Sequence, residues 1–421
     1  MSRRPSFAPL FACLFFAVGL SSAHAVTLQT PDACNFCNDP GDAANLVVPS
    51  GPFPNLTSAI AAAGGLDTIE IVGSLPAEAV TVTKRVCIIG APGGSPHAQR
   101  IFSATSSPTL TILEDGVCVK GLTIDKTGTG DVITIGNPST RVDDVGLHDN
   151  LVLTTSGATG SAIKVFGRMN EVVGNVLIGD GDIGIWLDGD MGNTENLIFS
   201  NTLNRHAVGI ALSWNSTGTG LFFDMAANEI AYNRIQRADR AIFAQGQEIF
   251  SINVEVRDNV YYQNVISEGV GAAFNPVGIY LIETSNELVE GNVISGYDTG
   301  VLLEGRATTG LDSLNNTLKD NRIQASVDGV KGVGLMDDIH FIGNDISTEN
   351  AGNTPAQFDG IDLFEACPFG SLAIELEGGT LFSNDCGLNT GLLTATCALT
   401  ITSSTSPDEV DFTAAVCAVD N

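Results

Sequence analysis

Short apolar segments recur through the middle of this chain, and each one follows an asparagine. One copy reads Asn170-Glu-Val-Val-Gly-Asn175-Val-Leu and the next reads Asn196-Leu-Ile-Phe-Ser-Asn201-Thr-Leu. The second asparagine of this phrase recurs every 23 to 32 residues, at Asn175, Asn201, Asn233, Asn264, Asn292, Asn321 and Asn344. A period of this length is typical of a solenoid, in which each repeat forms one coil.

A second apolar segment, which starts with a small residue, follows most copies of the phrase. Its copies are Gly184-Ile-Trp-Leu, Gly209-Ile-Ala-Leu, Ala241-Ile-Phe-Ala, Gly278-Ile-Tyr-Leu, Gly300-Val-Leu-Leu and Gly360-Ile-Asp-Leu. Apolar residues occupy alternate positions in these segments, and no long window in this region keeps a helical period. We therefore expect three strands of about three to four residues in each repeat. Such coils predict a parallel β-helix, with successive coils about 4.8 Å apart.

The recurring asparagines have a structural explanation. A sharp bend between strands needs a residue in the left-handed conformation, which Asn tolerates best after Gly. Stacked Asn side chains can also hydrogen-bond from coil to coil as a ladder. We therefore interpret the seven asparagines as bend and ladder residues rather than as ligand or glycan sites.

From roughly Leu46 to Glu365, the chain resembles the right-handed parallel β-helix repeat proteins of the pectin-lyase-like superfamily. The resemblance implies an all-β fold, a right-handed parallel β-helix solenoid of about ten coils over residues 66–364. In the N-terminal segment 26–65, the run Asn55-Leu-Thr-Ser-Ala-Ile-Ala-Ala-Ala is similar to the helix that caps such proteins. Residues 365–421 are expected to form a disulfide-rich C-terminal cap over the last coil.

Residues 1–25 have the pattern of a secretory signal peptide. Arg3 and Arg4 precede an apolar run over 10–20, and the small-x-small sequence Ala23-His24-Ala25 follows. The apolar run is too short to span a bilayer as a helix, although a retained membrane anchor is the alternative. We expect a secreted monomer in an extracellular or periplasmic space, without a membrane span after signal cleavage.

Cys13 lies in the signal peptide, and the eight cysteines that follow it are in keeping with an exported protein. An even number of cysteines favours disulfides over metal ligands, and the candidates are Cys34, Cys37, Cys87, Cys118, Cys367, Cys386, Cys397 and Cys417. Cys87 and Cys118 align as neighbours in adjacent coils, within disulfide range, although two stacked thiols fit as well. No His/Cys set has the spacing of a zinc site.

The net charge of −29 argues against nucleic acid as a partner, because phosphate binding needs a basic surface. The same field repels a polyanionic polysaccharide unless bound cations intervene. No resident cofactor is expected. Asp180-Gly-Asp182 and Asp188-Gly-Asp190 offer carboxylates to Ca²⁺, but they do not match an EF-hand loop.

The outward position of the second segment carries aromatic residues. Because Ile and Leu face the core, the residue between them faces outward, and it is Trp186, Phe243 or Tyr280 in three of the four central coils. Candidate polar neighbours in the next outward positions are Asp188, Gln245, Glu283 and Glu304. Flat rings beside hydrogen-bonding groups suit a sugar polymer. The alternative is that the insertions after Leu212 and Ala244 cover these rings.

The turns before these segments carry a charged cluster that is a candidate for catalysis. Asp182 and Asp239 are candidates for the two carboxylates of a glycoside hydrolase. His206 and Arg240 are candidates for the base and the cation that an elimination reaction needs. The alternative is an ordinary surface network of ion pairs.

Motifs of known enzyme families are absent. The chain lacks the Trp-Ile-Asp-His strand of pectate lyases and the Asn-Thr-Asp and Gly-His-Gly elements of polygalacturonases. No catalytic role can therefore be transferred from a relative. The sequence predicts a secreted β-helix protein that binds an extracellular or cell-wall polysaccharide and, as a lyase or hydrolase, cleaves it. The alternative is a non-catalytic cell-surface or periplasmic protein with a binding or structural role.

Overall fold

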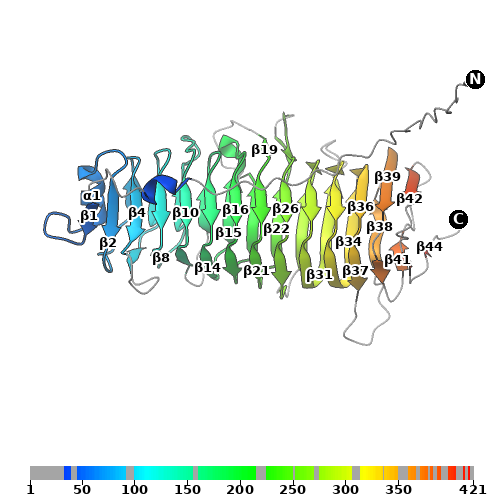
Figure 1. The fold of residues 1–421 in the computed structure, drawn as a ribbon. Helices are drawn as coiled ribbons and strands as arrows, with labels where there is room; N and C mark the ends of the chain where they lie inside the picture. The colour runs from blue at the N-terminus through cyan, green and yellow to red at the C-terminus, as the bar shows by residue number, and fades with distance from the viewer. Residues whose placement is uncertain are drawn as a thin grey trace, which may run out of the picture. The chain divides into compact units, whose positions relative to one another are not determined.

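Strands of successive coils stack on one another in parallel throughout the computed structural model (Figure 1). The structure describes residues 33–38, 45–91, 99–154, 160–214, 224–249, 252–269, 275–305, 313–334, 336–348, 359–366, 370–377, 380–382, 386–389, 397–403, 411–412 and 416–417. The predicted signal peptide lies outside these residues. Among the described residues, no helix is both long enough and apolar enough to cross a membrane.

The first sheet, here called sheet A, contains the strand between the two asparagines of each phrase. Among the described residues it has fourteen strands: β1 (Asn45–Val48), β2 (Thr68–Ile71), β4 (Cys87–Gly90), β7 (Cys118–Lys120), β10 (Gly146–His148), β13 (Glu171–Val173), β16 (Leu197–Phe199), β20 (Glu229–Ala231), β26 (Val260–Tyr262), β30 (Leu288–Glu290), β33 (Thr317–Lys319), β36 (Ile339–Ile342), β39 (Gly370–Glu377) and β42 (Cys397–Ser403).

The two other strands of each coil belong to a second sheet. Those in register with the segments after the second asparagine, here called row B1, are β5 (Arg100–Ser103), β8 (Thr123–Lys126), β11 (Leu151–Thr154), β14 (Val176–Gly179), β17 (Thr202–Asn204), β21 (Arg234–Gln236), β27 (Val265–Ser267), β37 (Asp345–Thr348), β40 (Thr380–Phe382) and β43 (Asp411–Phe412). Those in register with the Gly-Ile-x-Leu segments, row B2, are β3 (Val80–Val82), β6 (Leu110–Ile112), β9 (Ile133–Ile135), β12 (Ser161–Val165), β15 (Ile183–Asp188), β18 (Val208–Ser213), β22 (Arg240–Gln245), β28 (Val277–Ile282), β38 (Asp359–Ala366), β41 (Cys386–Asn389) and β44 (Val416–Cys417). In β31 (Val293–Gly305) and β34 (Arg322–Gly334) both rows form one continuous strand.

Within the described ranges, five two-residue strands add a short corner sheet before sheet A, which the sequence did not predict: β19 (Met225–Ala226), β25 (Val256–Arg257), β29 (Thr284–Ser285), β32 (Ser313–Leu314) and β35 (Met336–Asp337). An antiparallel hairpin, β23 (Gln247–Ile249) with β24 (Ile252–Val254), lies in the insertion after Ala244. The described part of the chain also contains two short 3-10 helices, η1 (Asn35–Asn38) and η2 (Gly189–Met191). The predicted all-β parallel β-helix is therefore confirmed.

The capping helix is also confirmed, as α1 (Leu56–Ala62). Asn55 is its N-cap residue, and its side-chain Oδ1 accepts a hydrogen bond of 2.8 Å from the backbone N–H of Ser58. Leu56, Ala59 and Ile60 are buried against the core. The apolar face of this helix covers the first coil, whose strands would otherwise have no neighbour.

The predicted asparagine ladder is present and fully buried. In each rung, the backbone N–H and the side-chain Nδ2 of one Asn both donate to Oδ1 of the Asn in the next coil, at 2.9–3.1 Å. The ladder starts one coil earlier than predicted, at Asn150, which bonds to Asn175 in the same way. The amides thus satisfy backbone groups at a bend that water cannot reach.

The predicted bend role of these asparagines is wrong. The left-handed residue is the one immediately before each Asn, for example Ser200 (φ 57°), Tyr232 (φ 56°) and Gln263 (φ 48°). The left-handed residue makes the sharp bend in the backbone. The Asn that follows it then points inward and bonds to the next coil. The bend is therefore formed by one residue and the ladder bond by the Asn that follows it.

The stacking of coils extends beyond the predicted limits. β1 lies before residue 66, while β39 and β42 continue sheet A after residue 364, so the number of coils exceeds the ten or so expected. The side chains of Cys386, Cys397 and Cys417 are not described, and Cys367 lies outside the described residues. Their predicted disulfides stay predictions.

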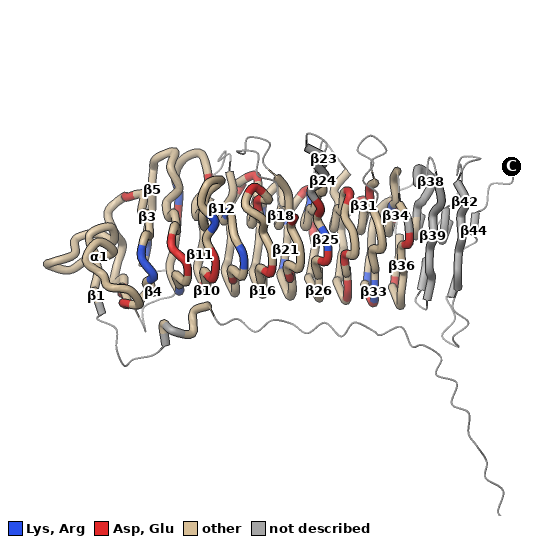
Figure 2. Tube along the Cα trace, turned by 90° about the horizontal axis from the view of Figure 1, so that it is seen from above, with Lys and Arg blue, Asp and Glu red and all other residues tan. Residues whose placement is uncertain are grey.

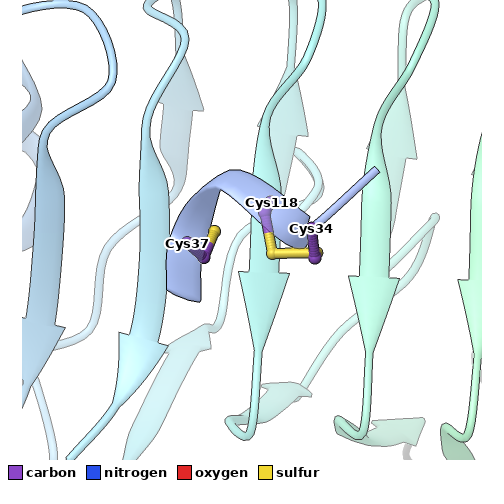
Figure 3. Close-up of side chains that lie close together, drawn as sticks. All are labelled: Cys34, Cys37 and Cys118. Atoms are coloured by element: carbon purple, nitrogen blue, oxygen red, sulfur yellow. A yellow bond between two sulfur atoms is a disulfide. The ribbon is translucent and has the colours of Figure 1, made fainter. Parts of the chain in front are cut away.

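The N-terminal disulfides differ from the expected pair. Cys87 and Cys118 are indeed register partners in β4 and β7. Each is bonded, however, to the segment that precedes the β-helix: Cys34 to Cys118, as Figure 3 shows, and Cys37 to Cys87. The segment that contains η1 lies on the outer face of sheet A. Its cysteines, Cys34 and Cys37, there contact Cys118 and Cys87.

Candidate functional site

The aromatic residues predicted to share one column do so. Strand pairing in row B2 places Trp186, Ala211, Phe243, Tyr280 and Leu302 at the same position of successive coils. All the aromatic members are half-buried, while the neighbouring Ile and Leu positions form the core. The rings of Phe243 and Tyr280 meet edge to face, with centroids 5.6 Å apart. The predicted column therefore exists as a partly exposed aromatic strip.

A hollow of about 310 Å³ lies beside this strip. Its walls combine predicted site residues with others: Ala207, Val208, Asp239, Arg240, Asn275, Val277, Tyr280 and Leu302. They come from four successive coils, because Val208, Arg240, Val277 and Thr299 are register partners at the start of row B2. A hollow of this size suits a small group such as one sugar unit.

Arg240 connects the hollow with the aromatic strip. Its guanidinium carbon lies 5.1 Å from the centroid of Phe243 and 5.3 Å from that of Tyr280. Contact with ring faces holds the guanidinium in place without consuming its hydrogen-bond donors. Within the described part of the chain, no carboxylate forms an ion pair with it. Arg240 thus presents a positive charge to the hollow.

Asp239 is half-buried beside this cation. Burial raises the pKa of its carboxyl group above the ordinary value, while the charge of Arg240 acts in the opposite direction. Asp182 is exposed. Backbone hydrogen bonds join Asp182 to Val208 and Ala207 to Asp239, which places the two aspartates two coils apart, about 9.6 Å along the β-helix.

His206 lies apart from this group. Its side chain is buried, and burial lowers the pKa of the imidazole to about 4. A neutral, enclosed imidazole does not reach a ligand on the outer surface. The structure therefore brings Asp239 and Arg240 to the hollow but not His206.

Trp186 is held by two contacts. Its Nε1 donates a hydrogen bond of 3.0 Å to the carbonyl oxygen of Ser213, and Nζ of Lys164 lies 3.7 Å from the ring centroid. Lys164 is buried and forms an ion pair of 2.8 Å with Asp188. The ring is consequently fixed on both sides, as a sugar platform needs to be. Sequence analysis missed this role of Lys164: the strand register places it one coil before Trp186, but its contact with the ring and its pair with Asp188 depend on side-chain packing.

The other predicted binding residues have mixed positions. Tyr280 Oη donates a hydrogen bond to Glu304, and Gln245 is half-buried at the outer surface. Asp188 and Glu283 are buried, so they are not part of the exposed strip. Next to Asp188, burial raises the pKa of Asp190 to about 6, and the Asp188 charge acts in the same direction.

Other charged residues in the same region form ion pairs. Arg205 contacts Asp180 at 2.7 Å, and Arg237 contacts Glu268 at 2.9 Å. Both pairs are exposed, where such pairs contribute little to stability. For these residues the alternative of a surface ion-pair network applies.

No group of carboxylates suited to a metal is apparent among the described residues. Only Cys34, Cys37 and Cys118 bring three potential ligand atoms together there, and all three are in disulfides. A role for Ca²⁺ therefore stays a prediction for binding experiments.

Comparison with known proteins supports the fold and no closer relationship. No protein family model and no curated protein matches the chain. A solved mannuronic acid specific polysaccharide family 6 lyase from human gut microbiota is 13% identical, with a TM-score of 0.50 over 86% of this chain and 91% of that one. A mutant tailspike protein of E. coli bacteriophage HK620, in complex with a pentasaccharide, is 13% identical, with a TM-score of 0.50 over 84% and 76%. Both share the parallel β-helix.

Proposed function

We propose that this chain is an exported protein that binds an extracellular or cell-wall polysaccharide on the outer face of row B2. The observation that carries this proposal is the aromatic strip of Trp186, Phe243 and Tyr280 beside the hollow with Arg240. Aromatic rings pack against the apolar faces of sugars, and the neighbouring polar groups bond their hydroxyls. The two β-helix neighbours, a polysaccharide lyase and a tailspike with a bound pentasaccharide, are in keeping with this class of ligand.

The geometry favours a sugar chain that runs along the β-helix axis. Trp186 and Phe243 are two coils apart, about 9.6 Å, with the small, buried Ala211 at the position between them. An extended polymer can then contact Trp186 with one unit and the Phe243–Tyr280 pair with another. Several weak contacts of this kind add up along one chain.

Arg240 favours an acidic sugar unit at the hollow. Figure 2 shows Lys and Arg residues scattered among Asp and Glu residues along the described coils. A cation held on two rings beside the hollow therefore provides a local positive charge in a protein of net charge −29. A carboxylate or sulfate accepts two hydrogen bonds from a guanidinium, which adds orientation as well as affinity.

Binding to a panel of neutral and acidic polysaccharides tests this proposal. We expect retention of at least one acidic polysaccharide and about tenfold weaker binding by Arg240→Gln, a loss of about 1.4 kcal/mol. Arg322→Gln is the matched control, because Arg322 is exposed in row B1, away from the strip. The proposal fails if no polysaccharide is retained, or if both variants bind like the wild type.

Cleavage of the bound polysaccharide is a second candidate function. It is supported by Asp239, whose raised pKa favours a carboxyl group that can donate a proton. Its two-coil distance from Asp182 is near the upper end of the carboxylate separations of inverting hydrolases, about 6.5–9.5 Å. New reducing or unsaturated ends, lost in Asp239→Asn, would support cleavage. Binding without such products would instead favour the non-catalytic alternative.

A further inference from the structure

Four cysteines lie together where residues 33–38, here called the strap, cross the outer face of sheet A. Figure 3 shows three of them, Cys34, Cys37 and Cys118. Cys34 and Cys37 come from one turn around η1, and both are bonded to the β-helix. Cys87 and Cys118 are register partners in β4 and β7. The sulfur atoms of Cys34, Cys37 and Cys118 all lie within 4.8 Å of one another.

The same four sulfur atoms allow a second pairing. Register partners in adjacent strands are about 4.8 Å apart, and disulfides span Cα distances of about 4.4–6.8 Å, so Cys87 can bond directly to Cys118. Cys34 and Cys37 have only two residues between them on a helical turn. We propose that the four cysteines exchange between two disulfide pairings: the one observed, which ties the strap to sheet A, and Cys34–Cys37 with Cys87–Cys118, which frees it.

The exchange needs only a catalytic thiolate, such as glutathione or a protein dithiol. The thiolate attacks Sγ of Cys37, forms a mixed disulfide there and displaces the Cys87 thiolate. Cys87 then attacks Cys118 and displaces the Cys34 thiolate. Cys34 finally attacks Cys37, closes the Cys34–Cys37 bond and releases the original thiolate. Each step replaces one S–S bond by another, so no net oxidation or reduction occurs.

Burial determines where this sequence starts. Cys87 and Cys118 are fully buried and Cys34 is almost so, whereas Cys37 is half-buried. Attack by an external thiolate requires access to the sulfur atom, which makes Cys37 the first point of attack. The later steps occur between sulfur atoms already in the cluster.

Folding and packing favour opposite pairings. The observed bonds close long stretches of chain, with sequence separations of 84 and 50, whereas the alternative bonds join much closer residues. Short loops close at a lower entropic cost, so the alternative pairing is favoured in the unfolded chain. In the folded β-helix, Cys34 fits against Gly146, where a Cβ would come within 2.5 Å of its sulfur. This contact favours the tied strap.

The two states hold the same number of disulfides but expose different surfaces. In the second state the strap no longer covers the outer face of β4, β7 and β10. The change does not depend on the overall redox potential, because it is an isomerisation. It depends on a thiol catalyst and on how tightly the strap packs.

Disulfide mapping of the full chain tests the proposal. The oxidised protein is incubated with reduced glutathione at levels that leave the number of free thiols unchanged, then alkylated, digested and analysed by mass spectrometry. We expect the Cys34–Cys118 and Cys37–Cys87 peptides to decrease together while the Cys34–Cys37 and Cys87–Cys118 peptides appear in equal amounts. Retention of only the two original links until free thiols accumulate would overturn the exchange.

A double variant tests the geometric premise by itself. Cys34→Ser with Cys37→Ser removes both strap cysteines, and we expect complete loss of free thiol at Cys87 and Cys118 under mild oxidation of the folded protein. Circular dichroism checks that the β-helix is intact. A folded variant whose two thiols persist would refute the alternative pairing. If this variant does not fold, two other double variants provide the test. Cys34→Ser with Cys118→Ser keeps only the Cys37–Cys87 bond, and Cys37→Ser with Cys87→Ser keeps only the Cys34–Cys118 bond. We expect the Cys37–Cys87 bond to be reduced several times faster. Equal rates would refute attack at Cys37.

Discussion

The side chain of Asn259 donates a hydrogen bond of 3.0 Å to Oε1 of Glu287, which occupies the position of an asparagine in a buried ladder. This second ladder lies at the end of the sheet A strands opposite to the first ladder. Its preceding rungs are Asn170, Asn196, Asn228 and Asn259. The backbone N–H of Glu287 in turn donates to Oδ1 of Asn316 at 2.9 Å. A carboxyl group thus takes the place of an amide.

This substitution predicts a pH-dependent stability. Burial raises the pKa of Glu287 from 4.5 to about 8. A raised pKa means that the folded state holds the proton more tightly than the unfolded state. The resulting stability is complete below pH 4.5 and is lost as the pH rises through about 8.

Glu287→Gln should remove this dependence, since an amide keeps the acceptor and does not ionise. We expect the variant to be more stable than the wild type at pH 9, by an amount on the order of a few kcal/mol, and similar to it at pH 4. Urea unfolding at several pH values measures the difference. Glu114→Gln, at an exposed position, is the control. Parallel pH profiles for wild type and Glu287→Gln would contradict the buried proton.

Asn233→Ala should destabilise the chain strongly. Its Nδ2 donates to the carbonyl oxygen of Ile198 at 2.8 Å and to Asn264, and its Oδ1 accepts two bonds from Asn201. Deletion of the amide leaves several buried backbone and side-chain groups without partners, a loss of roughly 2–4 kcal/mol. Chemical denaturation measures it, and Arg234→Ala, next in the chain and exposed, should change the free energy of unfolding by less than about 0.5 kcal/mol.

Gly278→Ala should also destabilise the fold, for a steric reason. A Cβ at this position would lie 2.5 Å from the carbonyl oxygen of Gly300 and 2.6 Å from Cγ2 of Ile294. Coils would have to move apart, at a cost of about 1–3 kcal/mol. Gly73→Ala, where no atom lies within 4 Å of the added Cβ, is the matched control. Equal midpoints of thermal unfolding for the two variants would refute the close approach.

Tyr280→Ala should weaken polysaccharide binding with a small effect on stability, since the ring is half-buried on the outer strip. We expect about tenfold weaker binding, equivalent to about 1.4 kcal/mol. Tyr232→Ala is the control, because Tyr232 is an exposed tyrosine at the corner between sheet A and row B1. A large drop in melting temperature with unchanged binding would instead indicate that Tyr280 is a covered core residue.

Trp186→Ala should affect both properties. Its ring covers the buried Lys164 and bonds to the Ser213 carbonyl, so its loss exposes the Lys164–Asp188 pair. We therefore expect weaker binding together with a loss of roughly 1–2 kcal/mol in stability. Titration with an oligosaccharide and thermal unfolding separate the two effects.

The sequence by itself determined the fold and the register of its columns. The Asn phrase and the Gly-Ile-x-Leu segments recur once per coil, and stacking in parallel register requires that identical positions align. This is why the ladder and the aromatic strip could be predicted without coordinates. The period is not exact at Asn286, where one extra residue before Asn292 places Glu287, and not Asn286, in the second ladder.

The tertiary structure alone decided which side chains are accessible and which are paired. His206 and Asp239 both belong to turns before row B2, yet one is enclosed and the other borders the hollow. Disulfide partners likewise depended on where the strap crosses sheet A, which no repeat encodes. Burial and contact arise from segments far apart in sequence, and the irregular insertions and termini follow no period from which their path could be derived.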